Sequence, residues 1–161
     1  MHEKIIHPFE PIFDSDSEIL ILGTLPSVKS RENAFYYGHP QNRFWKVVAA
    51  ICEEPIPSTI EEKKAFLHRN HIALWDVIAT CEIKGSSDSS IKNVTANNID
   101  SLLKKSNIRK IYCNGKKAKI LFDRHIEKHQ NITAEALPST SPANAAWTLD
   151  KLIAEWSVIL K

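Results

Sequence analysis

The sequence alternates short apolar runs with stretches of helical periodicity, and this alternation limits the folds that the chain can form. Apolar runs occupy residues 18–22 (EILIL), 72–77 (IALWDV) and 108–113 (IRKIYC), with a weaker run at 132–137. Such runs are typical of strands that are buried on both faces of a parallel sheet. Parallel strands need crossover connections, which helices provide. We therefore expect an α/β fold with three layers, α/β/α, around a four-stranded parallel sheet.

Four segments between these runs, and one after them, have apolar side chains that recur every three or four positions, as on one face of a helix. At the second of them, Ser58 or Thr59 is suited to cap the first turn, and Glu61 and Glu62 follow where the helix dipole favours acidic residues. The predicted helices span residues 42–51, 60–69, 95–105, 116–128 and 143–160.

The length of the chain predicts one domain. Its 161 residues, 43% of them apolar, can bury one substantial core but are too few for two domains of ordinary size. We therefore expect a single domain over residues 1–161. The apolar runs are far shorter than the ~20 residues that cross a bilayer, and residues 1–9 are too polar for a secretion signal. A cytoplasmic protein without a membrane partner is expected.

Cysteine and histidine spacing does not indicate a metal centre. Cys52, Cys81 and Cys113 form no CxxC pair and are too few for a four-cysteine iron–sulfur cluster, so we expect reduced thiols. His125 and His129 could share one face of a helix, but no further ligand pattern accompanies them. We expect no metal and no other cofactor. The net charge of +2 is compatible with a polyanionic partner without requiring one.

All strands of a parallel sheet end at the same edge, and ligands bind in the crevice beyond that edge. The loops at residues 23–41, 80–90, 114–116 and 138–144 should therefore converge on one site. The first loop is too long for a simple turn and is rich in proline and aromatic residues. Long loops on a rigid sheet usually carry function.

Two of these loops resemble the motifs of a known enzyme superfamily. The loop at residues 23–45, most specifically its string YYGHPQNRFW at 36–45, resembles motif 1 of the mismatch-specific uracil-DNA glycosylases and of the hypoxanthine-DNA glycosylases. Residues 137–145 (LPSTSPANA) resemble motif 2, the loop that those enzymes insert into DNA. Gly115 and Lys116 match at a third place, in the same order. The resemblance to the uracil-DNA glycosylase superfamily thus extends over nearly the whole chain.

Leu25 indicates the branch of the superfamily. Uracil-directed relatives carry an asparagine two residues after the glycine that matches Gly23, where this chain has Leu25. The hypoxanthine branch also lacks that amide, has a loop similar to residues 84–90 (KGSSDSS), and places its catalytic amide at the position of Asn42. The resemblance implies a DNA-deoxyinosine glycosylase, a monomeric hydrolase of base excision repair that acts on DNA containing deaminated bases.

The residue types suit this chemistry. A glycosylase must flip the nucleotide out of the helix and hold its base, and Tyr37 resembles the aromatic residue on which the base stacks. The alternative for Tyr37 is a lid over the core. Bond cleavage separates charge between sugar and base, which requires positioned dipoles. The Asn42 carboxamide could orient the attacking water or hold the base edge, and asparagine also suits the start of a helix.

The other predicted residues surround the base or contact DNA. Small side chains in the second motif would fill the gap left by the flipped nucleotide, and its hydroxyls would donate to phosphates; Ser141 or Asn144 could instead cap the last helix. Lys116 could bind a phosphate or be a solvated surface residue. The loop at residues 84–90 could line the base pocket or be an ordinary polar loop. The predicted pocket residues are Tyr37, Gly23, Leu25, Pro26, Ser86 and Asp88, and the predicted DNA-binding residues are Lys116, Ser139, Ser141, Pro142, Ala143 and Asn144.

Two other functions remain open at this point. Leu25 disfavours a mismatch-specific uracil glycosylase. A catalytically silent module that binds DNA or nucleotides could keep the same loops, although the presence of Asn42 and Tyr37 disfavours it. A phosphate-binding loop is disfavoured further, because the chain has only four glycines.

Overall fold

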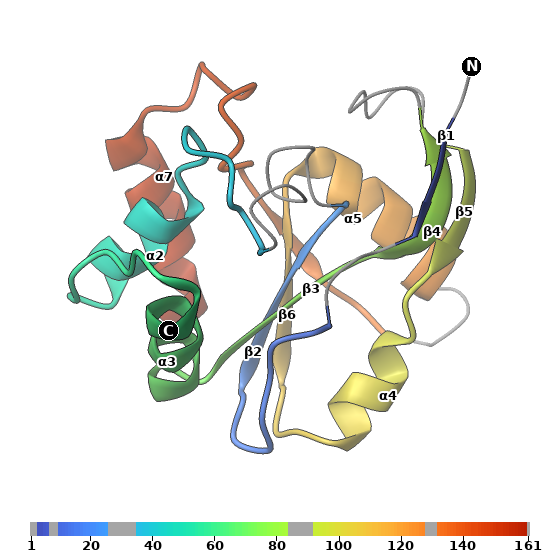
Figure 1. The fold of residues 1–161 in the computed structure, drawn as a ribbon, viewed down its shortest axis with the longest axis horizontal. Helices are drawn as coiled ribbons and strands as arrows, with labels where there is room; N and C mark the ends of the chain where they lie inside the picture. Colours follow the sequence, from blue (N-terminus) through green and yellow to red (C-terminus); the bar gives the residue numbers. More distant parts are fainter. Residues whose placement is uncertain (1–2, 7–9, 26–34, 84–91, 128–131, 161) are drawn as a thin grey trace.

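The centre of the computed structural model, which describes residues 3–6, 10–25, 35–83, 92–127 and 132–160, is a wholly parallel four-stranded sheet (Figure 1). Its strand order is β3-β2-β6-β7, and each neighbouring pair is parallel. The predicted parallel sheet is confirmed, with strand ends shifted by up to three residues from those expected. The strands are β2 (Ile19–Gly23), β3 (Ile72–Asp76), β6 (Lys110–Asn114) and β7 (Glu135–Leu137).

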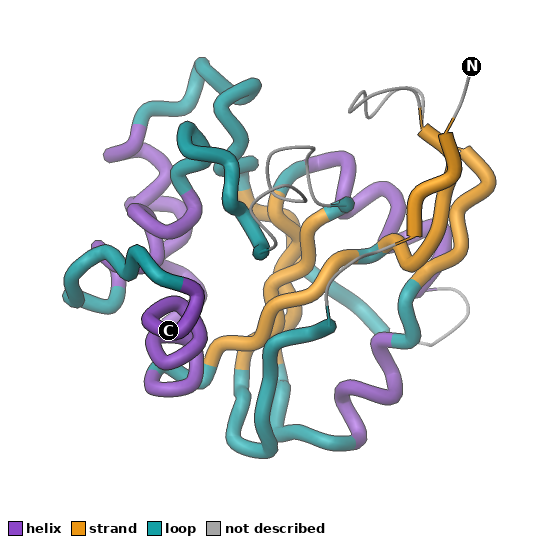
Figure 2. Tube along the Cα trace, viewed as in Figure 1, coloured by secondary structure: helices purple, strands orange, loops and turns teal. Residues whose placement is uncertain are grey.

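Helices cover both faces of this sheet, which confirms the predicted three layers (Figure 2). Alternate side chains of β2 enter two different cores: Ile21 packs in one with α2, α3 and α7, and Leu22 packs in the other with α4 and α5. All five residues of β2 are buried, as expected for a strand that is covered on both sides. The helices are α2 (Phe44–Ile51), α3 (Ile60–Arg69), α4 (Ile99–Lys104), α5 (Lys116–Phe122) and α7 (Leu149–Trp156).

Local capping signals determine where the helices begin. At α3, the Thr59 hydroxyl accepts a hydrogen bond from the Glu62 amide at 3.0 Å, and the Glu62 carboxylate accepts one from the Thr59 amide at 3.3 Å. This capping box selects Thr59 over Ser58 as the cap. Asn98 caps α4 and Thr148 caps α7. Each side chain accepts one hydrogen bond from a backbone amide of its helix.

A small antiparallel sheet is the main feature that the sequence pattern did not predict. It has the order β1-β4-β5 and consists of β1 (Glu3–Ile6), β4 (Ile78–Ile83) and β5 (Lys92–Ala96). The first residues of the predicted loop at 80–90 belong to β4, and the first residues of the predicted helix at 95–105 belong to β5. Both predictions are wrong there. The pairing of β1 with β4 joins segments far apart in the sequence, and β5 is too exposed to show an apolar pattern.

Four of the five predicted helices are shorter than expected, and the last two differ most. The last one begins at Leu149 and not at residue 143, because residues 139–147 form a loop with its own hydrogen bonds. The helix predicted over residues 116–128 is regular only to Phe122 and continues as a π-helical turn, η2 (Asp123–Glu127). A short 3-10 turn, η3 (Ser157–Leu160), follows α7.

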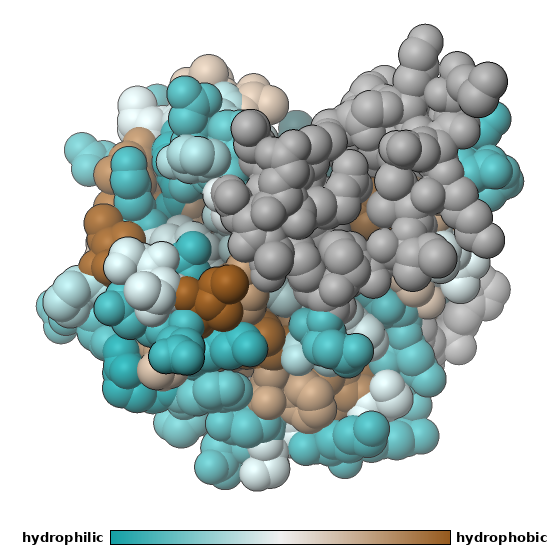
Figure 3. All heavy atoms as spheres, in the orientation of Figure 1, coloured by the Kyte–Doolittle hydropathy of each residue, from teal (hydrophilic) through white to brown (hydrophobic). Residues whose placement is uncertain are grey.

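The described surface contains no extended apolar area in the view of Figure 3, where small hydrophobic areas are separated by hydrophilic residues. In the part of the chain that the structure describes, no helix has both the length and the apolar character that a membrane span needs. Among the residues whose burial is described, the large apolar side chains that are exposed are Ile56, Ile60, Ile120, Leu149 and Leu160.

Candidate functional site

The carboxyl ends of the central strands meet at one edge of the sheet, as predicted. Gly23 at the end of β2 is the register partner of Asp76 at the end of β3, and Asn114 of β6 is the partner of Leu137 of β7. The loops that contain the two predicted motifs are hydrogen-bonded to each other above this edge. The candidate site is built here.

Gly23 leaves space for two polar groups at the floor of the site. A Cβ atom at this position would lie 2.5 Å from Asp76 Oδ1 and 3.1 Å from the Tyr37 hydroxyl oxygen, so a larger residue could not be accommodated without movement. Asp76 is only 3% exposed. The structure therefore brings together Gly23 and Tyr37, which were predicted as pocket residues, and adds Asp76, which was not.

Tyr37 combines an uncommon backbone conformation with a buried hydroxyl. Its φ of 53° lies in the left-handed region, which residues other than glycine rarely adopt. Its ring stacks on Phe44, with centroids 4.1 Å apart. The hydroxyl makes no well-formed hydrogen bond among the described residues, although the Asn114 amide lies beside it. Because Phe44 covers one face of the ring, a planar ligand can stack only on the other.

The Tyr37 phenol is neutral at physiological pH. Burial raises the pKa of Tyr37 well above its ordinary value, and the Asp76 carboxylate adds to the rise. Cys113 is equally unreactive, because burial raises the pKa of its thiol to about 12 and so disfavours the nucleophilic thiolate. Among the described residues, the groups around Tyr37 at the sheet edge are amides, hydroxyls and the Asp76 carboxylate, which suit binding and orientation.

Asn42 is held from two directions. Its Oδ1 atom accepts a hydrogen bond from the Phe44 amide at 2.9 Å and another from the Thr140 hydroxyl at 2.8 Å. The first bond lies just before α2, whose N-cap is Arg43 without a side-chain cap. The alternative in which Asn42 is the N-cap is therefore wrong: Asn42 lies one residue earlier, and its oxygen accepts from the first helical amide. The second bond reaches the other motif loop. The Asn42 oxygen thus connects the turn before α2 to the second motif loop.

Asn114 and Thr140 extend this contact to the end of β6. The Asn114 Nδ2 atom donates to Thr140 Oγ1 at 3.0 Å, and the Thr140 amide donates to Asn114 Oδ1 at 3.0 Å. Thr140 is completely buried. Sequence patterns did not select either residue, because their roles arise from contacts between distant segments; the position of Asn114 at a strand end was the only available signal.

Arg43 anchors the second motif loop through its main chain. Its guanidinium donates to the carbonyl oxygens of Ser141 and Asn144, at 3.0 and 3.1 Å, and to that of Trp147. The Arg43 amide also donates to the Thr140 carbonyl at 3.0 Å. The sequence analysis did not assign a role to Arg43, whose partner Trp147 lies 104 positions away.

The loop itself is organised by short-range hydrogen bonds. Ser139 Oγ accepts from the Ser141 amide and Ser141 Oγ accepts from the Ala143 amide, each at 3.1 Å, while Asn144 Nδ2 donates to the Ser139 carbonyl at 2.9 Å. Ala143 is exposed. Because Thr148 caps α7, the alternative in which Ser141 or Asn144 caps this helix is wrong.

The remaining predicted residues lie beside the hydrogen-bonded loops or outside the described residues. Lys116 is exposed at the first position of α5, directly after Gly115. A Cβ at Gly115 would lie 3.1 Å from Ser139 Cβ, so Lys116 stands close to the second motif loop. Leu25 is half-buried against the core around α4 and α5. Pro26, Ser86 and Asp88 lie outside the described residues.

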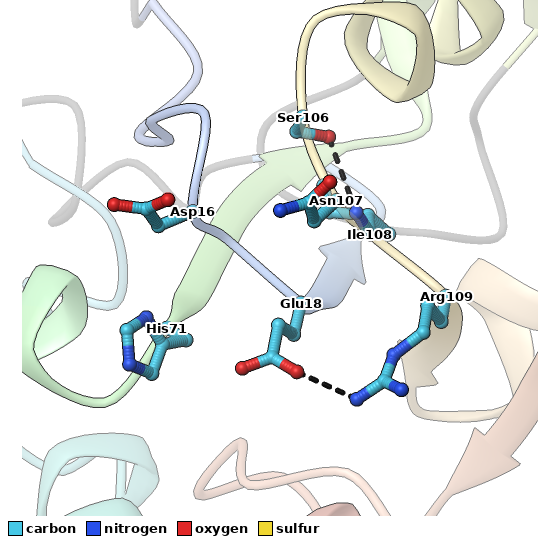
Figure 4. Close-up of a pocket in the computed structure, with 7 residues that line it drawn as sticks. All are labelled: Asp16, Glu18, His71, Ser106, Asn107, Ile108 and Arg109. Atoms are coloured by element: carbon cyan, nitrogen blue, oxygen red, sulfur yellow. Dashed lines mark hydrogen bonds and ion pairs between the residues drawn. The ribbon is translucent and has the colours of Figure 1, made fainter.

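An open depression of about 620 Å³ lies at the opposite edge of the sheet (Figure 4). Its residues include Glu18 and His71, which directly precede β2 and β3, and Arg109, which precedes β6. Arg109 pairs with Glu18 at 2.6 Å, and both side chains are substantially exposed. No predicted site residue lines this depression, which is therefore separate from the candidate site.

The chain is similar to known proteins along most of its length. A family model described as the uracil DNA glycosylase superfamily matches residues 10–158. A protein named hypoxanthine DNA glycosylase from Methanosarcina acetivorans is 34% identical over 155 residues, which cover 95% of this chain and 96% of that protein. A protein of the same name from Methanosarcina barkeri is 39% identical over 113 residues, 68% of this chain and 71% of its own.

The chain is also similar to solved structures. The solution NMR structure of a "putative Uracil DNA glycosylase" from Methanosarcina acetivorans superimposes with a TM-score of 0.81 and is 33% identical in sequence. The superposition covers 94% of each chain. The similarity thus includes the central sheet and the helices on both of its faces.

Proposed function

Because the chain belongs to the uracil DNA glycosylase superfamily, we propose that it is a DNA glycosylase that releases hypoxanthine from DNA. Two relatives carry the name hypoxanthine DNA glycosylase, and one of them matches nearly the full chain. The observation that carries the proposal is the hydrogen bond between Thr140 and Asn42, which joins the two motif loops in a single site. The presence of both Asn42 and Tyr37 at this site disfavours a silent binding module.

The proposed roles follow the positions of the side chains. A nucleotide that is flipped out of the duplex would place its base against the face of Tyr37 that Phe44 does not cover. The loop tip at Pro142, Ala143 and Asn144 would occupy the gap in the duplex. The Ser139 and Ser141 oxygens accept from the backbone, which leaves each hydroxyl hydrogen able to donate to a phosphate oxygen.

Hydrolysis would proceed with the electron pair of the glycosidic bond leaving on the base. The C1′–N9 bond breaks, water forms the new bond to C1′, and the proton that water loses neutralises the released base. The sugar becomes positive and the base negative on the way. Dipoles that are already oriented in a partly dry site stabilise such charge without reorganising.

Base release from defined oligonucleotides tests the proposed function. Duplexes that differ only in one hypoxanthine or one uracil, opposite the same partner, are incubated with the protein and then cleaved at abasic sites with alkali. We expect faster release of hypoxanthine, and faster release again where the lesion is poorly paired. Equal or faster release of uracil would instead support a mismatch-uracil enzyme, and no release of either base would support a silent module.

Substitutions of Tyr37 should separate its ring from its hydroxyl. Tyr37→Ala removes the stacking surface and is expected to weaken capture of the flipped base by about 1–3 kcal/mol. Tyr37→Phe keeps the ring and deletes a buried hydroxyl that has no well-formed hydrogen bond in the described structure, so a small effect is expected. Single-turnover rates and binding of DNA with an abasic site are measured for both. Equal losses would assign the function to the hydroxyl.

Replacement of Lys116 should weaken binding to all DNA sequences alike. The exposed charge would meet one phosphate, so Lys116→Ala should lower the slope of log affinity against log salt by about one phosphate contact, without changing lesion preference. Lys105→Ala is the matched control, because Lys105 is exposed near the opposite edge of the sheet. A changed lesion preference with an unchanged slope would place Lys116 in the base pocket.

A further inference from the structure

We propose that Asn42 acts on the substrate only as a hydrogen-bond donor, and that Thr140 and Asn114 are positioning residues that hold it in this orientation. The proposal rests on the proposed function and specifies how the amide would take part in it. It excludes the other role considered for Asn42, in which the amide oxygen orients the attacking water.

Backbone groups determine which way both amides face. The Phe44 backbone nitrogen can only donate, so the atom of Asn42 that lies 2.9 Å from it must be the oxygen. By the same reasoning, the Thr140 backbone nitrogen requires the Asn114 oxygen on its side, 3.0 Å away. Neither amide can be turned over without placing two donors against each other.

The direction of the intervening hydroxyl follows from these two amides. Asn114 presents its nitrogen to Thr140 Oγ1 at 3.0 Å, so that oxygen accepts there. The Thr140 hydroxyl hydrogen is then available for Asn42 Oδ1, 2.8 Å away. The Asn42 oxygen consequently accepts two hydrogen bonds, one for each of its lone pairs. It has no capacity left for a water molecule.

The nitrogen end of Asn42 is the end that remains available. Within the described residues Nδ2 has no protein acceptor, and it is not among the buried unpartnered atoms of the structure. Asn42 itself is half-buried. The amide therefore offers two N–H groups from a fixed position over the sheet edge.

A fixed donor suits the departing base and not the attacking water. An amide N–H cannot accept the proton that water loses, but it can donate to a ring nitrogen or carbonyl oxygen of the base as negative charge develops there. The bond changes remain those of simple hydrolysis: the C1′–N9 electron pair leaves on the base, and water supplies the new C1′ substituent and the proton. Asn42 would stabilise the leaving group.

The pH dependence of Asn42→Asp distinguishes a donor from a water-orienting acceptor. Aspartate can donate only while it is protonated, so its single-turnover rate relative to that of Asn42→Ala should increase as the pH falls toward about 5. The ratio cancels the acid lability of the substrate. If Asn42 oriented water, the carboxylate would do so better, and the ratio would increase with pH. A ratio that increases with pH, or that does not change, overturns the proposal.

Substitutions of Thr140 test the positioning role. Thr140→Val keeps the shape but removes the hydroxyl, and we expect the single-turnover rate to fall roughly 10-fold to 10²-fold, as for small misplacements of a reacting group. Thr140→Ser should recover most of that loss. Affinity for DNA with an abasic site should not change, since no base is present to bind. Equal rates for the valine and serine variants overturn this part of the proposal.

Thr59→Val provides the control for stability. It removes the hydroxyl that caps α3, which lies away from the site, so any loss in this variant reflects folding alone. The proposed function and this inference can fail separately. Failure of the wild-type protein to release hypoxanthine contradicts the proposed function, whereas release with the opposite pH trend in Asn42→Asp contradicts only the donor role.

Discussion

Asn42→Ala is expected to lower single-turnover release of hypoxanthine by roughly 10²-fold or more, the usual effect of removing one oriented polar group from an active site. The substitution deletes the only amide in the described structure that is hydrogen-bonded directly to both α2 and the second motif loop. Binding to DNA should persist, because the phosphate contacts proposed for Lys116 and the serines do not involve Asn42. The rate is measured with enzyme in excess over a hypoxanthine-containing duplex.

The fold of this variant should remain intact at a modest cost. The Phe44 amide and the Thr140 hydroxyl lose their shared acceptor, and a lost hydrogen bond typically costs about 1 kcal/mol. Asn98→Ala is the matched control, since Asn98 caps α4 through the Ser101 amide and lies outside the site. Both variants should lose similar stability, but only Asn42→Ala should lose activity. Release at the wild-type rate by a folded Asn42→Ala protein would remove Asn42 from the mechanism.

Gly23→Ala is expected to reduce both stability and activity. The added methyl group would stand 2.5 Å from Asp76 Oδ1, so the buried carboxylate or the strand end must move. Overpacking of this kind typically costs about 1–3 kcal/mol. Because the Tyr37 hydroxyl is the next atom in contact, at 3.1 Å, the ring proposed to hold the base should move as well. Denaturant unfolding and single-turnover release measure the two effects.

A double-mutant cycle identifies the cause of the loss. If the clash with Asp76 is responsible, Asp76→Ala in the Gly23→Ala background should cost less than Asp76→Ala in the wild-type protein, because the truncation relieves the contact. Activity need not return, since Asp76 lies in the same group of residues. If the stability losses of the two substitutions are strictly additive, the methyl group clashes with the end of the strand and not with the carboxylate.

The sequence predicted those parts of the fold whose signals are local. Buried strands such as β2 show as apolar runs, and α3 shows through a capping box that lies within four consecutive residues. The antiparallel sheet escaped prediction because β1 and β4 recognise each other only in three dimensions. The last helix was extended too far, since nothing near residue 143 reveals that Arg43 holds the carbonyls there.

The residues of the candidate site also divide into those with a local signal in the sequence and those without one. Tyr37, Asn42 and the second motif loop lie in strings that resemble known motifs, so the sequence could indicate them. Asp76, Asn114 and Thr140 are ordinary polar residues in the linear sequence. They acquire a role only when β3, β6 and the loop before α7 are brought to one sheet edge.

The Arg43 contacts have a consequence for how the second motif loop can change during evolution. The guanidinium binds main-chain carbonyl oxygens, which every amino acid possesses. With the side-chain bonds of Ser139, Ser141 and Asn144 also kept, the path of the loop does not depend on the alanines that it carries. Exposed positions such as Ala143, Ala145 and Ala146 are therefore open to substitution without loss of the loop's shape. A library randomised at these three alanines, with Arg43 kept, should yield many folded proteins that differ in how they engage the duplex.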